Sequence, residues 1–364
     1  MIFGYVSDSS QQDKRISITP EIVKKLNADN IKVFINKDYG KHSNINDQKF
    51  LDAGASIEEK QKIYAESDVL VQIKFEDNNI VKSLKNGCSL IVNQFDKNKK
   101  NLESELKSKK INIFSLDLLP RITRAQSMDI LSSQANLAGY KAVVDSVYEF
   151  NRAIPMMMTA AGTVSPAKFF VIGAGVAGLQ AIATAKRMGG VVSATDVRAV
   201  SKEQVESLGG RFVFVENSEN LETAGGYAKE ASEDFKKKQE ELLKKTIKDQ
   251  DIVICTALIP GKKAPRIISE EMVLSMKPGS IICDLAASQG GNSAFSEADK
   301  IIEKNGIKII GYSNFASRIS ETASALLAKN IYNFVQLIYD KESKSIKINM
   351  EDEIIKNTYI GDVN

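Results

Sequence analysis

The chain has 364 residues, which exceeds the size at which one hydrophobic core usually stops growing, so two domains are expected. Its 49 Lys and Arg residues nearly balance its 46 Asp and Glu residues and are spread along the chain, so nothing indicates a nucleic-acid partner. Three cysteines without paired spacing and a single histidine, His42, argue against a disulfide framework, a zinc or other metal site and a Ser-His-Asp hydrolase.

No segment has the character of a signal peptide or a membrane span. The N-terminus "MIFGYVSDSS" has neither a basic leader nor a sustained apolar region. The longest apolar-leaning run, "AKFFVIGAGVAGLQAIATAK" (167–186), is interrupted by three glycines, which suits a buried strand and helix better than a span. We therefore expect a cytoplasmic protein that does not itself cross a membrane.

Two series of short β-rich runs alternate with segments of helical length. The first is "MIFGYV", "IKVFIN", "VLVQIK", "LIVNQF" and "INIFSL", before Pro120. The second is "KFFVIG", "VVSATD", "RFVFVE", "DIVICTAL", "SIICDLA" and "IKIIGYSN". Each alternation predicts βα units around a parallel sheet, so the expected class is α/β.

Between the two series lies a polar stretch, "RITRAQSMDILSSQ" (121–134), that leads into a long helix. Thr123 and Gln126 have the spacing of a helix capping box. Apolar residues then recur at helical spacing up to about Asn151, before Pro155. We expect this helix to join the two domains. The polar residues are either its solvated first turns or part of a site.

The C-terminal segment, "SRISETASALLAKNIYNFVQLIYD", is helical and has no place in the second sheet. We expect it to return to the first domain, which would then comprise residues 1–130 and 315–364, around a second domain of residues 131–314. A charged insertion at 216–251 predicts an exposed helix. Its "AGGYA" predicts a flexible loop near 222–230.

The glycine motif G-x-G-x-x-G follows the apolar strand "KFFVI" and comprises Gly173, Gly175 and Gly178. Glycines there permit a tight turn, close approach of a pyrophosphate and close packing of strand and helix. The helix that begins near Val176 favours the anion through its N-terminus. The alternative is a glycine-rich turn that serves packing alone.

Asp196 ends the next strand, 18 residues after the last glycine, where a carboxylate can bind the hydroxyl groups of adenosine ribose. It would repel a 2′-phosphate, so NAD(H) is preferred over NADP(H). Arg198 leaves NADP(H) open, because a nearby arginine can accommodate that phosphate. Arg198 is otherwise an ordinary surface charge.

With "RAQSMDILSSQ", "PMMMTAAGTVSPAK", "GAGVAGLQAIATAKR", "ATDVR", "ETAGGYAKE" and "TALIPGKKAP", the chain resembles the NAD(H)-binding alpha subunit of proton-translocating NAD(P) transhydrogenase. The superfamily includes alanine dehydrogenase, and the resemblance spans nearly the whole chain. It implies two Rossmann-like domains with parallel sheets, joined by long helices, with the cofactor in the interdomain cleft. It also implies the split-subunit form of the enzyme.

The resemblance assigns residues to the bound nucleotide. It implies that Arg121, Gln126, Asp129 and Ser132 lie against the nicotinamide, where Gln126 offers a donor and acceptors to the carboxamide. The other implied contacts are Asp196, Val197 and Arg198 around the adenosine, Gly226 and Tyr227 in a mobile loop, and Ala257 and Leu258 beside the nucleotide. For Leu258 the alternative is an ordinary core residue at a strand end.

Oxidation of an amine or alcohol needs a group that takes a proton. Alanine dehydrogenases use a histidine after the strand that matches "LIVNQF", where this chain has none, and an aspartate where this chain has Ser288. Arg15 and Lys74 match positions that hold the substrate carboxylate in those enzymes, but they cannot supply that proton chemistry. Hydride transfer between two nicotinamides has no proton to abstract and needs only close, aligned, shielded rings.

Because the sequence has one dinucleotide motif, the second nicotinamide must belong to another polypeptide. The resemblance names a beta subunit with an NADP(H)-binding domain and a proton-conducting membrane domain. It further implies a homodimer, held peripherally at the cytoplasmic face of the inner membrane, and the Si-specific, AB-type class of transhydrogenase. Two alternatives stay open: an alanine-type amino-acid dehydrogenase, and a non-catalytic module that senses NAD(H).

Overall fold

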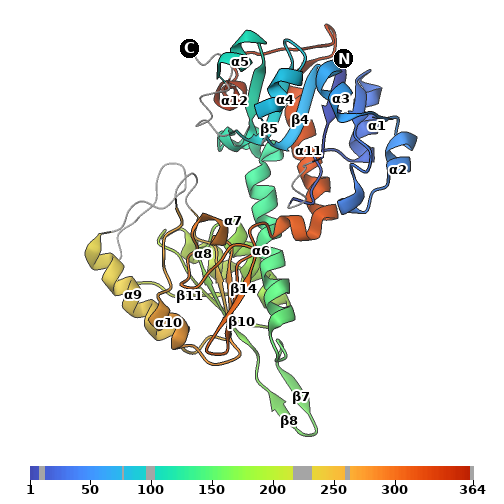
Figure 1. The fold of residues 1–364 in the computed structure, drawn as a ribbon. Coiled ribbons are helices and arrows are strands. Elements are labelled where there is room, and N and C mark those ends of the chain that lie inside the picture. Colours follow the sequence, from blue (N-terminus) through green and yellow to red (C-terminus); the bar gives the residue numbers. More distant parts are fainter. Residues whose placement is uncertain (8–12, 76–77, 96–102, 216–231, 259–262, 361–364) are drawn as a thin grey trace. The chain divides into compact units, whose positions relative to one another are not determined.

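The computed structural model describes residues 1–7, 13–75, 78–95, 103–215, 232–258 and 263–360. The chain divides into two compact units, coloured along the sequence in Figure 1. The first unit comprises Met1–Gln134 and Ile319–Asn364, and the second comprises Ala135–Arg318. The limits expected from the sequence fall four residues before each of these boundaries.

The first unit contains a six-stranded sheet in the order β3-β2-β1-β4-β5-β6, in which every neighbouring pair is parallel. Its strands are β1 (Ile2–Tyr5), β2 (Lys32–Ile35), β3 (Ser56–Ile57), β4 (Val69–Lys74), β5 (Ser89–Gln94) and β6 (Asn112–Ser115). The central strands are buried along most of their length, as parallel strands covered by helices should be. The predicted parallel sheet is confirmed; β3 was not predicted because two residues give no readable alternation.

Helices and short turns surround this sheet. They are α1 (Pro20–Ala28), η1 (Lys41–Ser43), α2 (Asp47–Asp52), α3 (Lys60–Glu66), α4 (Asn78–Ser83), α5 (Glu103–Ser108), η3 (Leu116–Leu118), η4 (Thr123–Met128), α11 (Ser320–Ile338) and α12 (Glu353–Thr358), with a small hairpin of β16 (Tyr339–Asp340) and β17 (Ser345–Ile346). The C-terminal helix α11 buries Leu327, Ile331 and Phe334 in the same core as Phe3 and Phe114. It is therefore part of the first unit.

The second unit contains a seven-stranded sheet in the order β11-β10-β9-β12-β13-β15-β14. Its strands are β9 (Lys168–Ile172), β10 (Val191–Thr195), β11 (Arg211–Phe212), β12 (Ile252–Cys255), β13 (Ile281–Asp284), β14 (Ile301–Lys304) and β15 (Ile307–Ile310). All pairs are parallel except β14 and β15. The second predicted sheet is confirmed, whereas the edge strand β14 was missed although Asn305 and Gly306, both at positive φ, are a strong hairpin signal.

The remaining elements of the second unit are α6 (Ile130–Glu149, which begins in the first unit), α7 (Val176–Arg187), α8 (Ser201–Ser207), α9 (Glu233–Ile247), α10 (Glu270–Leu274), η5 (Ala287–Gln289), η6 (Ala316–Ile319, which ends in the first unit) and the hairpin of β7 (Met157–Thr159) and β8 (Gly162–Val164). Residues of α6 and α7 share one hydrophobic cluster with the sheet, and residues of α9 and α10 share another. None of the described helices is long and apolar enough to cross a membrane.

The long helix begins later than the sequence suggested. Thr123–Met128 forms the 3₁₀ turn η4 without a side-chain cap, so the predicted capping box of Thr123 and Gln126 is wrong. The α-helix α6 starts at Ile130. Its cap is Asp129, whose Oδ1 accepts the N–H of Ser132 at 2.9 Å. Since an aspartate at the N-cap satisfies a free N–H of the first turn, the helix starts where that cap is available.

Candidate functional site

The glycine motif lies at the carboxyl end of β9, the strand from which the sheet order runs in both directions. Such a switch point is where parallel α/β sheets bind ligands. The fold itself requires two of the three glycines. Gly173 has φ +95° and a Cβ there would lie 2.7 Å from Thr256 Oγ1, while a Cβ at Gly178 would lie 1.9 Å from the Gly173 carbonyl oxygen.

Gly175 is different, because nothing in the described chain lies within 4 Å of where its Cβ would be. Its φ of −77° is open to any residue, and no side chain caps the helix that follows. The first residue of that helix, Val176, is 42% exposed. An unencumbered helix N-terminus with open space before it suits a phosphate group. Packing alone accounts for Gly173 and Gly178 but not for Gly175.

Asp196 follows β10 and accepts four hydrogen bonds. The N–H of Ala174 donates to Oδ2 at 2.7 Å, the N–H of Arg198 donates to Oδ1 at 2.9 Å, and the Arg198 guanidinium reaches both oxygens at 2.8 Å. Burial acts to raise the pKa of Asp196, but the hydrogen bonds from Arg198 and Ala174 outweigh it and hold the pKa below its ordinary value.

This pairing changes the sequence-based interpretation. A carboxylate has about four acceptor positions, and those of Asp196 are occupied within the chain. A ribose hydroxyl must therefore share them or displace part of the Arg198 fork. Arg198 is only 17% exposed as a side chain, so it is not an ordinary surface charge. Val197, between the two, is half-buried.

Ala257 and Leu258 follow β12, the strand next to β9. Leu258 is 40% exposed, which is inconsistent with the alternative of an ordinary core residue. The Ala257 backbone is fixed by Asn292: its N–H donates to Asn292 Oδ1 at 3.1 Å, and its carbonyl accepts from Asn292 Nδ2 at 2.9 Å. Sequence reasoning gave no role to Asn292, and the only available signal was an asparagine after the paired glycines of "DLAASQGGN".

The stretch 121–134 divides into residues that hold the fold and residues that face outward. Asp129 and Ser132 bond to each other at the start of α6, through the N–H and also from Ser132 Oγ to Oδ2 at 2.5 Å. Arg121 and Gln126 are both exposed. The Gln126 amide makes no hydrogen bond within the described residues. Of the four residues predicted at the nicotinamide, two are therefore engaged in a helix cap.

The cationic residues expected from the alanine dehydrogenase comparison lie at the carboxyl ends of β1 and β4. Arg15 donates from Nε and Nη2 to the Asp13 carboxylate and from Nη1 to Gln134 Oε1 at 2.9 Å. The adjoining cavity, lined also by Lys74, is about 20 Å³, space for roughly one water molecule. An amino acid does not fit there unless Asp13 is displaced.

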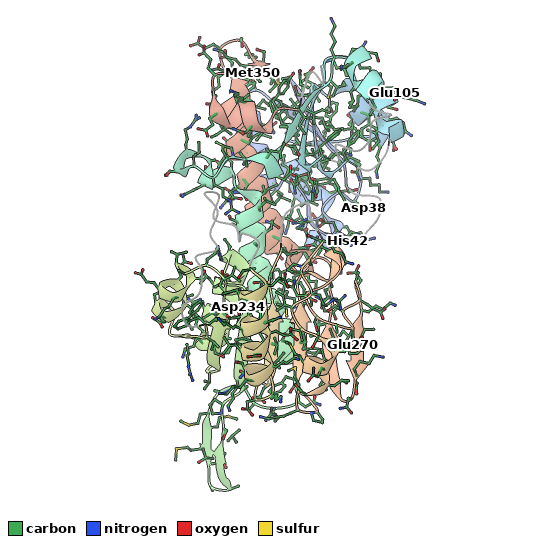
Figure 2. All side chains as sticks on the ribbon, turned by 90° about the vertical axis from the view of Figure 1, so that its left-hand side faces the viewer. Asp38, His42, Glu105, Asp234, Glu270 and Met350 are labelled. Atoms are coloured by element: carbon green, nitrogen blue, oxygen red, sulfur yellow. The ribbon has the colours of Figure 1, made fainter. Side chains whose placement is uncertain are left out.

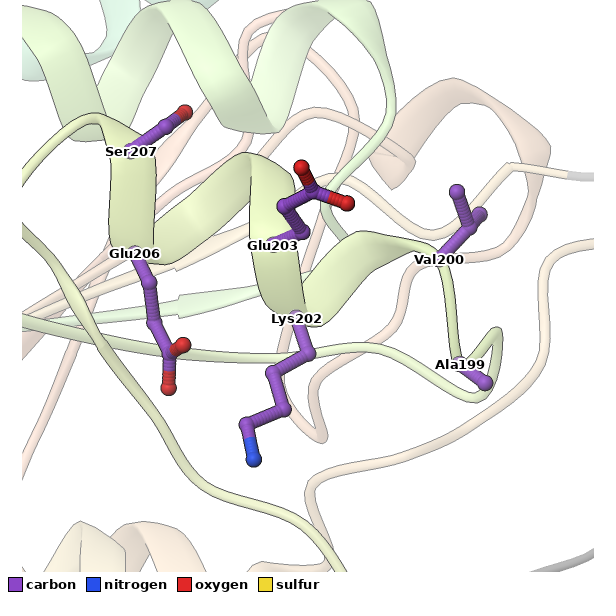
Figure 3. A pocket seen from close by; sticks show the side chains of 6 residues that line it. All are labelled: Ala199, Val200, Lys202, Glu203, Glu206 and Ser207. Carbon is purple, nitrogen blue, oxygen red and sulfur yellow. The ribbon is translucent and has the colours of Figure 1, made fainter.

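Other predicted features carry no site. Gly226 and Tyr227 lie outside the described residues. His42 is exposed in η1 (Figure 2), and Ser288 is exposed in η5. A wide hollow beside α8 is lined by Lys202, Glu203 and Glu206, among others. Their side chains point to opposite sides of the helix and do not converge (Figure 3).

Two family models cover almost the entire chain. The N-terminal domain of alanine dehydrogenase/PNT matches residues 4–138, and the C-terminal domain of alanine dehydrogenase/PNT matches residues 142–362. The chain belongs to the alanine dehydrogenase/PNT family. Within this family it is 49% identical over 356 residues to the first of the alpha-subunit chains of NAD(P) transhydrogenase from Rhodospirillum rubrum, with 96% of this chain and 93% of that protein covered.

Solved structures of the alanine dehydrogenase/PNT family agree. The crystal structure of transhydrogenase from Sinorhizobium meliloti has a TM-score of 0.88 and 42% identity, and the match covers 99% of this chain and 98% of that one. An L-alanine dehydrogenase has a TM-score of 0.77 at 19% identity, covering 99% and 94%, which establishes a shared fold alone. The predicted resemblance to transhydrogenase alpha subunits is thus confirmed, as is the α/β fold with two Rossmann-like sheets.

Proposed function

We propose that this chain is the NAD(H)-binding component of a proton-translocating NAD(P) transhydrogenase, in which hydride passes directly between NADH here and NADP⁺ on a partner subunit. The observation that carries the proposal is the open space at Gly175, before the uncapped N-terminus of α7. The fold has no need of a glycine at that position, whereas a bound pyrophosphate has. The identity to transhydrogenase alpha subunits supports the same function.

Each candidate group has a defined task in this proposal. The turn Gly173–Gly175, with Val176 and Gly178, would hold the pyrophosphate. Asp196, Val197 and Arg198 would hold the adenosine, with Ala257 and Leu258 beside the nucleotide. Gly226 and Tyr227 would cover it. Arg121, Gln126, Asp129 and Ser132 would fix the nicotinamide. NAD(H), when bound, supplies or takes the hydride.

The residues at 121–134 suit positioning better than proton transfer. Gln126 is a neutral amide that can both donate to and accept from a carboxamide. Asp129 already accepts two hydrogen bonds from Ser132, so it is poorly placed to act as a base. Transfer between two nicotinamide rings needs alignment and exclusion of water, and orientation of the ring is what these groups can contribute.

The partners follow from the same proposal. A beta subunit would bind NADP(H) and provide the proton-conducting membrane domain, which would hold this chain at the cytoplasmic face of the inner membrane. The enzyme would be of the Si-specific, AB-type class. We also propose a homodimer. The hairpin of β7 and β8 supports it, because Met156 and Met158 are 61% and 82% exposed and an isolated hairpin is marginally stable in water.

The test is direct. The purified chain is mixed with the NADP-binding domain of the partner and saturating nucleotides, and reduction of an NADP⁺ analogue is followed at the expense of NADH. We expect transfer without any amino acid present. Oxidation of NADH that depends on pyruvate and ammonia, by the chain alone, would favour the amino-acid dehydrogenase. Binding of NADH without any transfer would favour the sensing module.

A further inference from the structure

The 3₁₀ turn η4 presents three distinct faces, because a 3₁₀ helix has three residues per turn and side chains at i and i+3 eclipse. Ala125 and Met128 form one face and are buried in the core of the first unit. Arg124 and Ser127 form the second. Thr123 and Gln126 form the third, which is exposed and bears no contact that holds it.

Such a turn is not stable by itself. Runs of 3₁₀ helix longer than three or four residues are uncommon, since their hydrogen-bond geometry is poor. η4 has six residues and no side-chain cap. Its conformation, and with it the direction of Gln126, must therefore be fixed by the faces that contact the rest of the first unit.

The C-terminal half of the turn is held by α11. Asn330 Nδ2 and Asn333 Nδ2 both donate to the carbonyl oxygen of Ser127, at 2.8 and 2.9 Å. Asn330 is itself fixed, because its Oδ1 accepts from Ser133 Oγ at 2.7 Å. The residue directly after Gln126 thus has a firmly anchored backbone.

The N-terminal half is held by an ion pair with a residue 228 positions away. Arg124 Nη1 donates to Asp352 Oδ2 at 2.6 Å, and Nη2 donates to Oδ1 at 2.8 Å, which makes a parallel two-bond fork. Asp352 is fixed in turn, since its Oδ1 caps α12 by accepting from the N–H of Ile354 at 2.9 Å and of Ile355 at 3.4 Å.

We propose that Arg124 is a positioning residue for the nicotinamide: its fork to Asp352 sets the orientation of η4 and so aims Gln126. This inference rests on the proposed function. Arginine is required at position 124 because a lysine has the charge but not the planar fork that fixes a direction. The Arg124 side chain is 53% exposed, and exposed ion pairs add little to stability. Its geometry is therefore more important than its energy.

Three variants separate geometry from stability. Arg124→Gln removes the fork and the charge, Arg124→Lys keeps the charge without the fork, and Asp352→Asn keeps a capping oxygen for α12 while it loses the carboxylate. We expect each to lower the rate of hydride transfer to the partner about 10-fold or more, as a small misplacement does. The KM and Kd for NADH should change less than about 3-fold, because the pyrophosphate and adenosine contacts are intact. Melting temperatures should stay within about 4 °C.

Two further measurements are independent of activity. In the chain without nucleotide, the NMR signal of the Gln126 side-chain amide should shift in all three variants, and less in the matched control Lys25→Gln, which breaks the exposed pair of Lys25 with Glu21. The double variant Arg124→Gln/Asp352→Asn should be no slower than either single variant, because one contact is lost in each.

The outcomes distinguish this inference from the proposed function. If the wild-type chain transfers hydride and the variants do so equally fast, or if the double variant is slower by the product of the two effects, Arg124 has no positioning role. If the variants lose NADH affinity or unfold in step with their loss of rate, the role is structural. If the wild type transfers no hydride at all, the proposed function is wrong, and the NMR shift of Gln126 still decides whether the fork orients it.

Discussion

Ser132 donates to both oxygens of Asp129, from its backbone N–H to Oδ1 at 2.9 Å and from its hydroxyl to Oδ2 at 2.5 Å. The two residues therefore cap α6 with the same atoms that the proposed function directs at the nicotinamide. Any substitution at either position affects the helix as well as the site. The first prediction uses variants that separate these effects.

Asp129→Asn retains an N-cap acceptor, whereas Asp129→Ala loses it. Because asparagine caps a helix about as well as aspartate, Asp129→Asn should melt within about 2 °C of the wild type, and Asp129→Ala should lose about 1 kcal/mol of stability. If the carboxylate also holds the nicotinamide, both should lower hydride transfer by a similar factor. Thermal melts beside the partner assay test this. Full activity of Asp129→Asn would leave Asp129 with the cap alone.

Gln126→Ala should behave in the opposite way to a structural variant. Its side chain is exposed and makes no hydrogen bond within the described residues, so stability should change by less than about 0.5 kcal/mol. Hydride transfer should fall about 10-fold or more, because the ring loses a group that orients it. Ser127→Ala, one residue further on, is the control, since its backbone carbonyl and not its hydroxyl is anchored. Equal rates for Gln126→Ala and the control would remove Gln126 from the site.

Two glycine variants should dissociate nucleotide binding from folding. In Gly175→Ala the new methyl group meets no protein atom within 4 Å, so stability should change by about 1 kcal/mol or less. NADH affinity should fall more than about 10-fold, because the methyl group enters the space of the pyrophosphate. Titration calorimetry measures the affinity.

Gly178→Ala provides the contrast. Its methyl group would lie 1.9 Å from the Gly173 carbonyl oxygen, so strand and helix must move apart. We expect a loss of about 1–3 kcal/mol of stability, together with weaker binding. If Gly175→Ala binds NADH normally, the pyrophosphate does not lie at this helix N-terminus.

The pairing of Asp196 makes stability depend on pH with a definite sign. The folded-state pKa of Asp196 lies below its unfolded value, so its contribution is fully present above about pH 4 and is lost as pH falls through the folded pKa. Asp196→Asn removes that contribution. The gap in unfolding free energy between wild type and variant should be constant at neutral pH and should shrink below about pH 4, as measured by urea titration. A gap that widens on acidification would contradict the assigned shift.

The sequence predicts what local patterns encode and misses what distant contacts decide. The apolar runs around Val71 and Val253 indicated buried parallel strands, because burial on both faces leaves an uninterrupted apolar signature. The glycine motif was likewise recognisable from spacing. The edge strand β14 was missed because its residues Ile301–Lys304 are mostly exposed and charged.

The errors at the site have the same origin. The capping box failed because the buried residues Ala125 and Met128, together with α11, hold the turn as a 3₁₀ helix, and no local pattern reveals α11. Asn292 binds Ala257 across 35 positions, and Arg124 binds Asp352 across 228. Partners this far apart in one sequence leave no periodicity to detect.

The three-faced turn η4 makes its length more constrained than its composition. Each residue of a 3₁₀ helix turns the chain by about 120°. A single insertion or deletion between Thr123 and Met128 would therefore rotate every later side chain onto the wrong face, and place a polar residue in the core where Met128 lies. Point substitutions on the outward face leave this phase intact. The stretch should accordingly tolerate exchange of Thr123 while it rejects any change in the number of residues.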